Sequence, residues 1–175
     1  MKIIKKTITK NIVKAILISV FAIFSATNVH AEDGAIRFSN NAFKQVISKD
    51  AGGLTKYDYV EPGLVLPKDV ILYEIVFENI SKQPVSNIVV NNPIANNSIY
   101  RSSSATGEAT EITFSVDGKD FASADALTIK DKTGKVWQAK PEDYVAIRWL
   151  YKKELKPGEK SKVTYKTTIK LATGM

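Results

Sequence analysis

Residues 161–171 have the sequence SKVTYKTTIKL, in which apolar and polar side chains alternate. One parity holds Val163, Tyr165, Thr167, Ile169 and Leu171, and the other holds lysines and threonines. Because successive side chains of a β-strand point to opposite faces, this period of two predicts a strand with one buried face and one face in water.

The same pattern recurs upstream in the chain. Residues 111–116 and 144–151 alternate in this way, and 69–79 carries apolar residues on both parities, which predicts a central strand partly covered on both faces. Shorter candidates are 36–38, 43–48, 85–91, 98–101, 127–130 and 135–138. Residues 39–53 are polar and carry the weakest pattern.

Turn signals separate these stretches at short intervals. They are Glu61-Pro62-Gly63, Gln83-Pro84, Asn92-Pro93, Asp117-Gly118, Lys132-Thr133-Gly134 and Lys156-Pro157-Gly158. Such intervals are too short for crossover helices, so the strands must be mostly antiparallel. The sequence predicts an all-β, immunoglobulin-like antiparallel β-sandwich, ahead of a jelly roll or a small barrel.

Two of the strands and their turns resemble a known domain. Leu66-Pro67-Lys68-Asp69 precedes the strand at 70–79, a second strand ends in Asn92-Pro93-Ile94, and 155–159 looks like a closing turn. Together they are similar to the conserved-repeat domain of bacterial surface and secreted proteins, a domain of unknown function. The resemblance covers roughly residues 60–171.

This resemblance implies an immunoglobulin-like wall, stalk or adhesion module, and it brings no catalytic residues. Lys68, Asn92 and Ala95 depart from the family pattern, which has glycine, aspartate and proline there. Most relatives carry the module in tandem, whereas one copy is found here, so we expect a stand-alone member.

The first residues have the three-part pattern of an export signal. Five lysines precede an apolar run at 15–24, and small residues follow up to Ala31. The run of about 10 residues is short for a bilayer span, which takes about 20. We expect cleavage between Ala31 and Glu32, with Val29 and Ala31 before the cut; an uncleaved anchor is the alternative.

The expected domains are therefore a signal peptide, 1–31, and one β-sandwich domain, 32–175. Cleavage would leave no stable transmembrane segment. The product would be exported to the periplasm or the medium.

Composition excludes much chemistry from residues 32–175. The chain has no cysteine, and its one histidine is His30, so the expected mature part lacks both imidazole and thiol. Ser-His-Asp and Cys-His catalysis and His/Cys zinc sites are excluded there. The net charge of +7 divides into +5 for 1–31 and +2 for the rest, which gives no nucleic-acid footprint.

Acidic turns and aromatic residues remain as candidate sites. Asp117 and Asp131 lie in turns without the spacing of a calcium loop, so we predict ordinary turns, no metal and no cofactor. Trp149 shares a strand face with Ile147, which favours burial in the core. Trp137 and Tyr144 are the candidate ligand contacts, although Tyr144 could equally be a structural corner tyrosine.

These observations favour an exported, non-enzymatic module that contacts an envelope or extracellular protein, by surface complementarity or by adding a partner strand to a sheet edge. The alternative is a carbohydrate-binding module in which Trp137 and nearby aromatics contact a glycan. A hydrolase ranks third, because the usual catalytic residue types are missing.

Overall fold

The structure is a computed structural model that describes residues 35–171. Within this range the regular elements are β-strands and one short 3₁₀ turn, η1 (Pro141–Asp143). All strand pairs in the described residues are antiparallel. The all-β, antiparallel prediction is confirmed.

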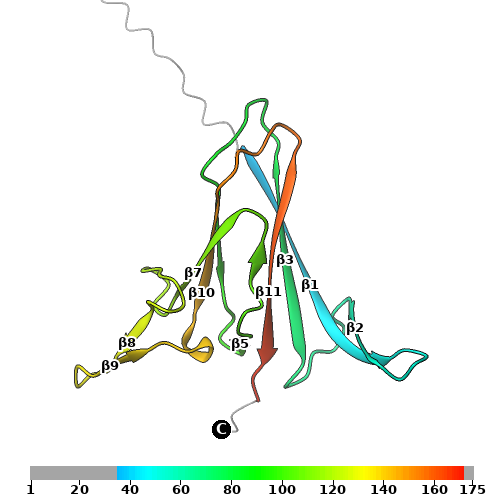
Figure 1. The fold of residues 1–175 in the computed structure, drawn as a ribbon, viewed down its shortest axis with the longest axis vertical. Helices are drawn as coiled ribbons and strands as arrows, with labels where there is room; N and C mark the ends of the chain where they lie inside the picture. The colour runs from blue at the N-terminus through cyan, green and yellow to red at the C-terminus, as the bar shows by residue number, and fades with distance from the viewer. Residues whose placement is uncertain (1–34, 172–175) are drawn as a thin grey trace, which may run out of the picture. The chain divides into compact units, whose positions relative to one another are not determined.

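The larger sheet of the described residues has six strands. Five of them lie in the order β2-β1-β3-β11-β5, and β6 also pairs with β11 (Figure 1). Their bounds are β1 (Ile36–Lys49), β2 (Thr55–Val60), β3 (Val70–Asn79), β5 (Ser98–Tyr100), β6 (Thr106–Gly107) and β11 (Lys160–Ile169).

A smaller sheet faces part of the larger one. Within residues 35–171 it has three strands in the order β4-β10-β7, which are β4 (Val89–Pro93), β7 (Thr110–Ser115) and β10 (Ala146–Tyr151). A separate two-stranded sheet joins β8 (Thr128–Lys130) to β9 (Val136–Gln138).

Aromatic side chains from the two larger sheets meet in one core. Trp149 of β10 lies 5.9 Å from Tyr165 of β11, and Phe77 of β3 lies 5.4 Å from Tyr151 of β10, measured between ring centroids. Trp149 is fully buried, as its strand face predicts. Two sheets packed around a common core form the arrangement of a β-sandwich.

The strand predicted from 161–171 is β11. Val163, Tyr165 and Thr167 are buried, which confirms the alternation. Burial raises the pKa of the Tyr165 hydroxyl, which accepts a hydrogen bond from the side-chain amide of Asn92. Leu171 was predicted on the same buried face but is 65% exposed, because the strand ends at Ile169.

Other boundaries also differ from the prediction. The separate candidates at 36–38 and 43–48 form one strand, β1, and neither β2 nor β6 was predicted. The strand expected at 144–151 begins at Ala146. The strand expected at 85–91 is β4, which begins at Val89 and continues to Pro93, because Asn87 has a positive φ of 57° that interrupts extended backbone. Val85 makes only an isolated bridge to Leu155.

Predicted turns contain glycines in the left-handed region. Gly118, Gly134 and Gly158 have φ values of 78°, 90° and 75°. Lys68 also lies there, at 73°, at the position where the resembling family has glycine. A side chain at that φ costs energy that a glycine would not.

Candidate functional site

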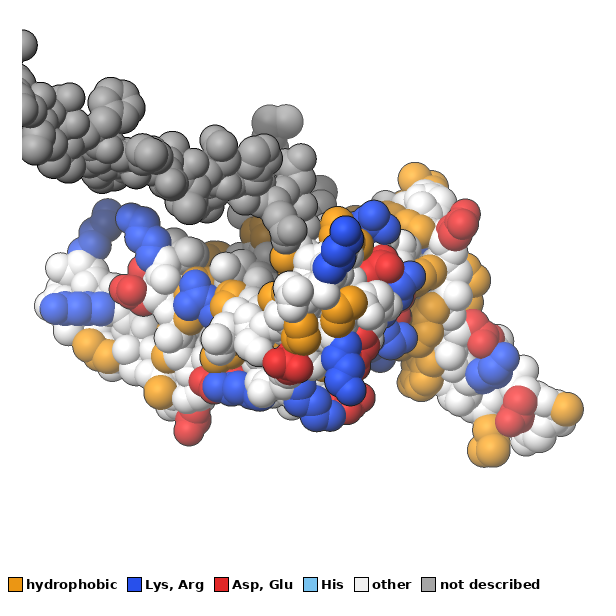
Figure 2. All heavy atoms as spheres, turned by 90° about the horizontal axis from the view of Figure 1, so that it is seen from above, with side chains coloured by type: hydrophobic (Ala, Val, Ile, Leu, Met, Phe, Trp, Pro, Cys, Tyr) orange, Lys and Arg blue, Asp and Glu red, His pale blue; other side chains and the backbone are white. Residues whose placement is uncertain are grey.

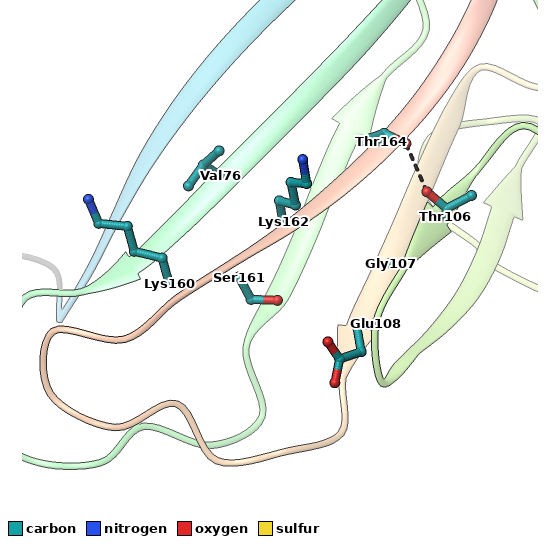
Figure 3. A pocket seen from close by; sticks show the side chains of 8 residues that line it. All are labelled: Val76, Thr106, Gly107, Glu108, Lys160, Ser161, Lys162 and Thr164. Atoms are coloured by element: carbon teal, nitrogen blue, oxygen red, sulfur yellow. Dashed lines mark hydrogen bonds between the residues drawn. The ribbon is translucent and has the colours of Figure 1, made fainter.

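A groove runs along the first half of β11. It has a volume of about 610 Å³ and is lined by Val76, Thr106, Gly107, Glu108, Lys160, Ser161, Lys162 and Thr164 (Figure 3). Figure 3 shows Ser161 and Glu108 on opposite sides of this space. The size lies within the range of ligand-binding pockets, about 300–1,000 Å³.

The groove lies beside a sheet edge that is only partly paired. β11 pairs with β3 from Lys160 to Thr168, but on its other side it pairs with β6 only at Val163 and Thr164 and with β5 only from Thr167. In the described part of the chain, no strand pairs with that side of residues 160–162.

The direction of the backbone groups follows from the neighbouring hydrogen bonds. The amide of Lys166 donates to Ser104 Oγ and its carbonyl accepts from the amide of Arg101, so Lys166 faces away from β3. Alternate residues of a strand face the same side. The amides and carbonyls of Lys162 and Lys160 therefore face the groove.

The edge is open because β6 leaves the sheet after two residues. A Cβ on Gly107 would lie 2.8 Å from Val163 Cγ1 and 2.7 Å from Thr110 Oγ1, so only glycine fits this close approach. Ala109 then has a positive φ of 51°, and its carbonyl accepts from the amide of Lys152. The chain thus turns from β6 into β7 of the other sheet.

Charged side chains around the groove are paired. Lys162 bonds Glu74 at 2.8 Å, Lys160 lies 3.6 Å from Glu78, and Lys153 bonds Glu108 at 2.7 Å. The hydrogen bond and the charge of Lys153 lower the pKa of Glu108. Paired charges therefore surround the backbone amides and carbonyls of Lys160 and Lys162, which pair with no strand on this side within residues 35–171.

The groove is lined by hydroxyl, lysine and carboxylate side chains. Residues 35–171 contain no histidine or cysteine, and in this range no three metal-ligating side chains gather into a site. The hydroxyls of Thr106 and Thr164 bond each other at 2.8 Å. Beside these side chains, the backbone amides and carbonyls of Lys160 and Lys162 face the groove.

The acidic turns have local structural roles. Asp117 Oδ1 accepts hydrogen bonds from the amides of Lys119 and Asp120, which lowers the pKa of Asp117. The pKa of Asp131 is also lowered. The largest cause is the hydrogen bond from the Thr133 hydroxyl, and the bond from the amide of Lys135 lowers the pKa further, whereas desolvation acts in the opposite direction. Both carboxylates hold their own turns in place.

Tyr144 and Trp137, the candidate ligand contacts, lie in different surroundings. Tyr144 is buried and stacks on Phe114 with 4.7 Å between ring centroids, and burial raises the pKa of its hydroxyl. One side of it lines a hollow of about 260 Å³. Trp137 lies in β9, opposite Ile129, and is 39% exposed. Trp137 is therefore the more accessible of the two.

The sequence did not predict the groove. β6 is too short to give a periodic pattern, and no residue pattern marks the point where it leaves the sheet. Gly107, between Thr106 and Glu108, was the one local signal for a close backbone approach. The predicted cleavage residues Val29, Ala31 and Glu32 lie outside the described residues.

Comparisons with known proteins found no relative of this chain. No family model matches the chain, and neither the curated proteins nor the solved structures contain a match. Across the described residues, no helix has the length and hydrophobicity needed to cross a bilayer.

Proposed function

We propose that the protein is an exported, non-enzymatic immunoglobulin-like module of the bacterial cell envelope, and that its groove along β11 binds an extended segment of a partner protein. The partner segment adds as a short strand beside Lys160 and Lys162. The single observation that carries this proposal is the unpaired edge, whose amides and carbonyls face the groove.

Several features support the immunoglobulin-like and exported parts of the proposal. Two antiparallel sheets enclose a fully buried tryptophan, Trp149, as in immunoglobulin domains. The resemblance to the conserved-repeat domain over 60–171 agrees with that architecture. The lysine-rich, apolar pattern of 1–31 favours export to the periplasm or the medium.

Backbone pairing explains how such a module recognises a partner without catalytic groups. Hydrogen bonds from the strand edge supply affinity, and side chains beside the edge supply specificity. Ser161 and Glu108 flank the groove, so they are in position to select the side chains of the added segment.

The test removes one backbone donor from the groove. Proline at 162 lacks the amide that faces the groove, but it removes no bond to β3, because Lys162 faces the other way. We expect Lys162→Pro to lose at least about tenfold in retention of the envelope protein captured by the wild type, and Lys162→Ala to retain it.

Circular dichroism shows whether the proline unfolds the strand, and in that case a second variant tests the proposal. Ser161→Tyr fills the groove from a side chain and leaves the backbone intact, so it should also lose the partner. Equal retention by wild type, Ser161→Tyr and Lys162→Pro contradicts the proposal, as does a wild type that retains no envelope protein.

Glycan binding is the second candidate function, and the exposure of Trp137 favours it. An exposed indole ring can stack on a sugar, whereas the buried Trp149 cannot. Titration with envelope glycans should then shift tryptophan fluorescence, and Trp137→Ala should abolish the shift. No shift in the wild type would exclude this function for the glycans tested.

A further inference from the structure

β2 is the outermost strand of the larger sheet, beyond β1 (Figure 1). Most of its residues are exposed, and in the described residues no strand pairs with its outer side. Hydrophobic side chains of this β1–β2 hairpin are also exposed, with Ile47 at 68%, Leu54 at 71% and Tyr57 at 56%. Figure 2 shows orange, hydrophobic side chains gathered on the surface at the right of the view.

The hydrogen bond at the hairpin turn determines which backbone groups of β2 are free. The amide of Asp50 donates to the carbonyl of Leu54 at 3.0 Å, so Leu54 faces β1. By alternation Lys56, Asp58 and Val60 also face β1. The amides and carbonyls of Thr55, Tyr57 and Tyr59 therefore point outward, away from the sheet.

We propose that two copies of the chain pair through β2, antiparallel, about a two-fold axis at Tyr57. This surface is separate from the groove on β11. In this register Tyr57 opposes Tyr57 of the second copy, and outward-facing backbone groups meet outward-facing groups. The larger sheets of the two copies join into one.

Charge complementarity selects both the second copy and the register. With the axis at Tyr57, Lys56 of each copy opposes Asp58 of the other. An axis at Lys56 or at Asp58 would instead place like charges opposite each other. Within one copy Lys56 already lies 2.8 Å from Asp58, so pairing joins two ion pairs into one group of four charges.

The exposed apolar face gives the pairing a further gain. Ile47 is opposite Tyr57 in the hairpin, so Ile47, Tyr57 and Tyr59 share one face of the sheet. In the proposed register Tyr59 also comes opposite Thr55 of the second copy. The two hairpins then form one continuous cluster of tyrosines and isoleucines, and cross-strand aromatic pairs of this kind stabilise a sheet.

The test uses charge reversal and the purified protein, expressed from the full sequence. We expect sedimentation equilibrium to show a dimer of the wild type. Lys56→Asp and Asp58→Lys should each weaken self-association at least about tenfold, since each places like charges opposite each other. A mixture of the two variants should associate again, because every opposed pair then has opposite charges.

Two control variants make the same charge reversals at exposed residues outside the β1–β2 hairpin. Lys132→Asp and Asp120→Lys should dimerise like the wild type. A monomeric wild type at about 100 μM, variants that dimerise as well as the wild type, or a mixture that fails to associate would each overturn the proposal.

Cysteine pairing tests the register directly and covers the case in which a charge variant fails to fold. The natural chain has no cysteine. Opposed residues at a pair without hydrogen bonds have Cα atoms about 4.5 Å apart, within disulfide range. Oxidation of mixed Lys56→Cys and Asp58→Cys proteins should give a disulfide-linked dimer, and either variant alone should give much less. Equal linking in all three samples would contradict this register.

Discussion

The sandwich core and the β1–β2 hairpin both contain strands with large apolar residues, but these residues have different surroundings. β10 and β11 alternate apolar and polar residues, and their apolar faces are buried against each other. The hairpin also has apolar residues, on both of its faces, but Ile47, Tyr57 and Val60 are exposed. Strand β1 belongs to both regions, because its first part pairs with β3 and its last part pairs with β2.

This difference shows what hydrophobic residues do in each region. In the sandwich they stabilise the fold, because each sheet covers the other. In the hairpin they add little to the fold of one copy, and their burial requires another surface. Proposed pairing through β2 provides that surface.

The largest expected contrast comes from one substitution made in both regions. Ile147 is fully buried in β10, whereas Ile47 is mostly exposed in β1. Ile147→Ala should lower the free energy of unfolding by about 2–5 kcal/mol, because it removes buried methyl groups and leaves a cavity. Ile47→Ala should change it by less than about 0.5 kcal/mol.

Urea unfolding followed by tryptophan fluorescence measures both values. The protein concentration should be low enough for single copies, so that association does not contribute to stability. A loss above about 1.5 kcal/mol for Ile47→Ala would mean that the hairpin is part of the cooperative core, and the distinction between the two regions would be wrong.

The sandwich could be predicted because apolar and polar residues alternate along its strands, and this alternation follows directly from which face of each strand is buried. The strand at 161–171 and the tryptophan at 149 were placed correctly, since one face of each strand meets the opposite sheet. β2 was missed because residues 55–60 mix lysine, aspartate and tyrosine, and no buried face imposes a period. The end at Ile169 also had no signal, so Leu171 was wrongly expected inside.

The candidate site was less predictable than the fold. An unpaired edge depends on which strands are neighbours, and antiparallel turns leave several sheet orders open. The sequence suggested strand addition but no particular edge. Trp137 and Tyr144 belong to the same aromatic-rich stretch of the sequence, yet one lies in β9 and the other in the core, because η1 lies between them.

A polar substitution should give the next largest contrast between the regions. Asn79 is fully buried at the end of β3, and its amide donates to the carbonyls of Gln83 at 2.7 Å and Leu155 at 2.8 Å. Asn79→Ala should cost about 2–3 kcal/mol, because a buried carbonyl loses its partner. In the hairpin, the exposed bond from Ser48 to Asp58 makes Ser48→Ala nearly neutral.

Chemical denaturation of the two variants checks this difference. Equal midpoints for Asn79→Ala and wild type would show that the buried amide adds nothing to stability. The backbone pairing between β3 and β11 would then not depend on the side-chain amide of Asn79.

A smaller effect of opposite sign is expected in the segment that joins the hairpin to the sandwich. Lys68 has a positive φ, and its amide donates to the carbonyl of Ile169 at 2.9 Å. Lys68→Gly should raise the free energy of unfolding by about 0.5–1 kcal/mol, since glycine adopts this φ without strain. Lys82→Gly, at an exposed lysine without a positive φ, should be neutral or destabilising. Thermal unfolding should therefore give a higher midpoint for Lys68→Gly and an unchanged or lower midpoint for Lys82→Gly, and equal shifts would contradict the strain at Lys68.

The smallest expected effect is the pH dependence of the contact between the same segment and β1. Asp69 accepts a hydrogen bond from the amide of Leu66 and pairs with Lys44 at 2.7 Å, and these two partners, in that order, lower the pKa of Asp69. A lowered folded-state pKa adds stability above the unfolded value of about 3.9, and that stability is lost as the pH falls through the folded value. Asp69→Asn should therefore flatten the decrease of the urea midpoint below about pH 4. If Asp69→Asn instead retained the wild-type slope, the contact of Asp69 with Lys44 would not stabilise the attachment of β1 to this segment, and the boundary between the sandwich and the hairpin would depend on backbone pairing alone.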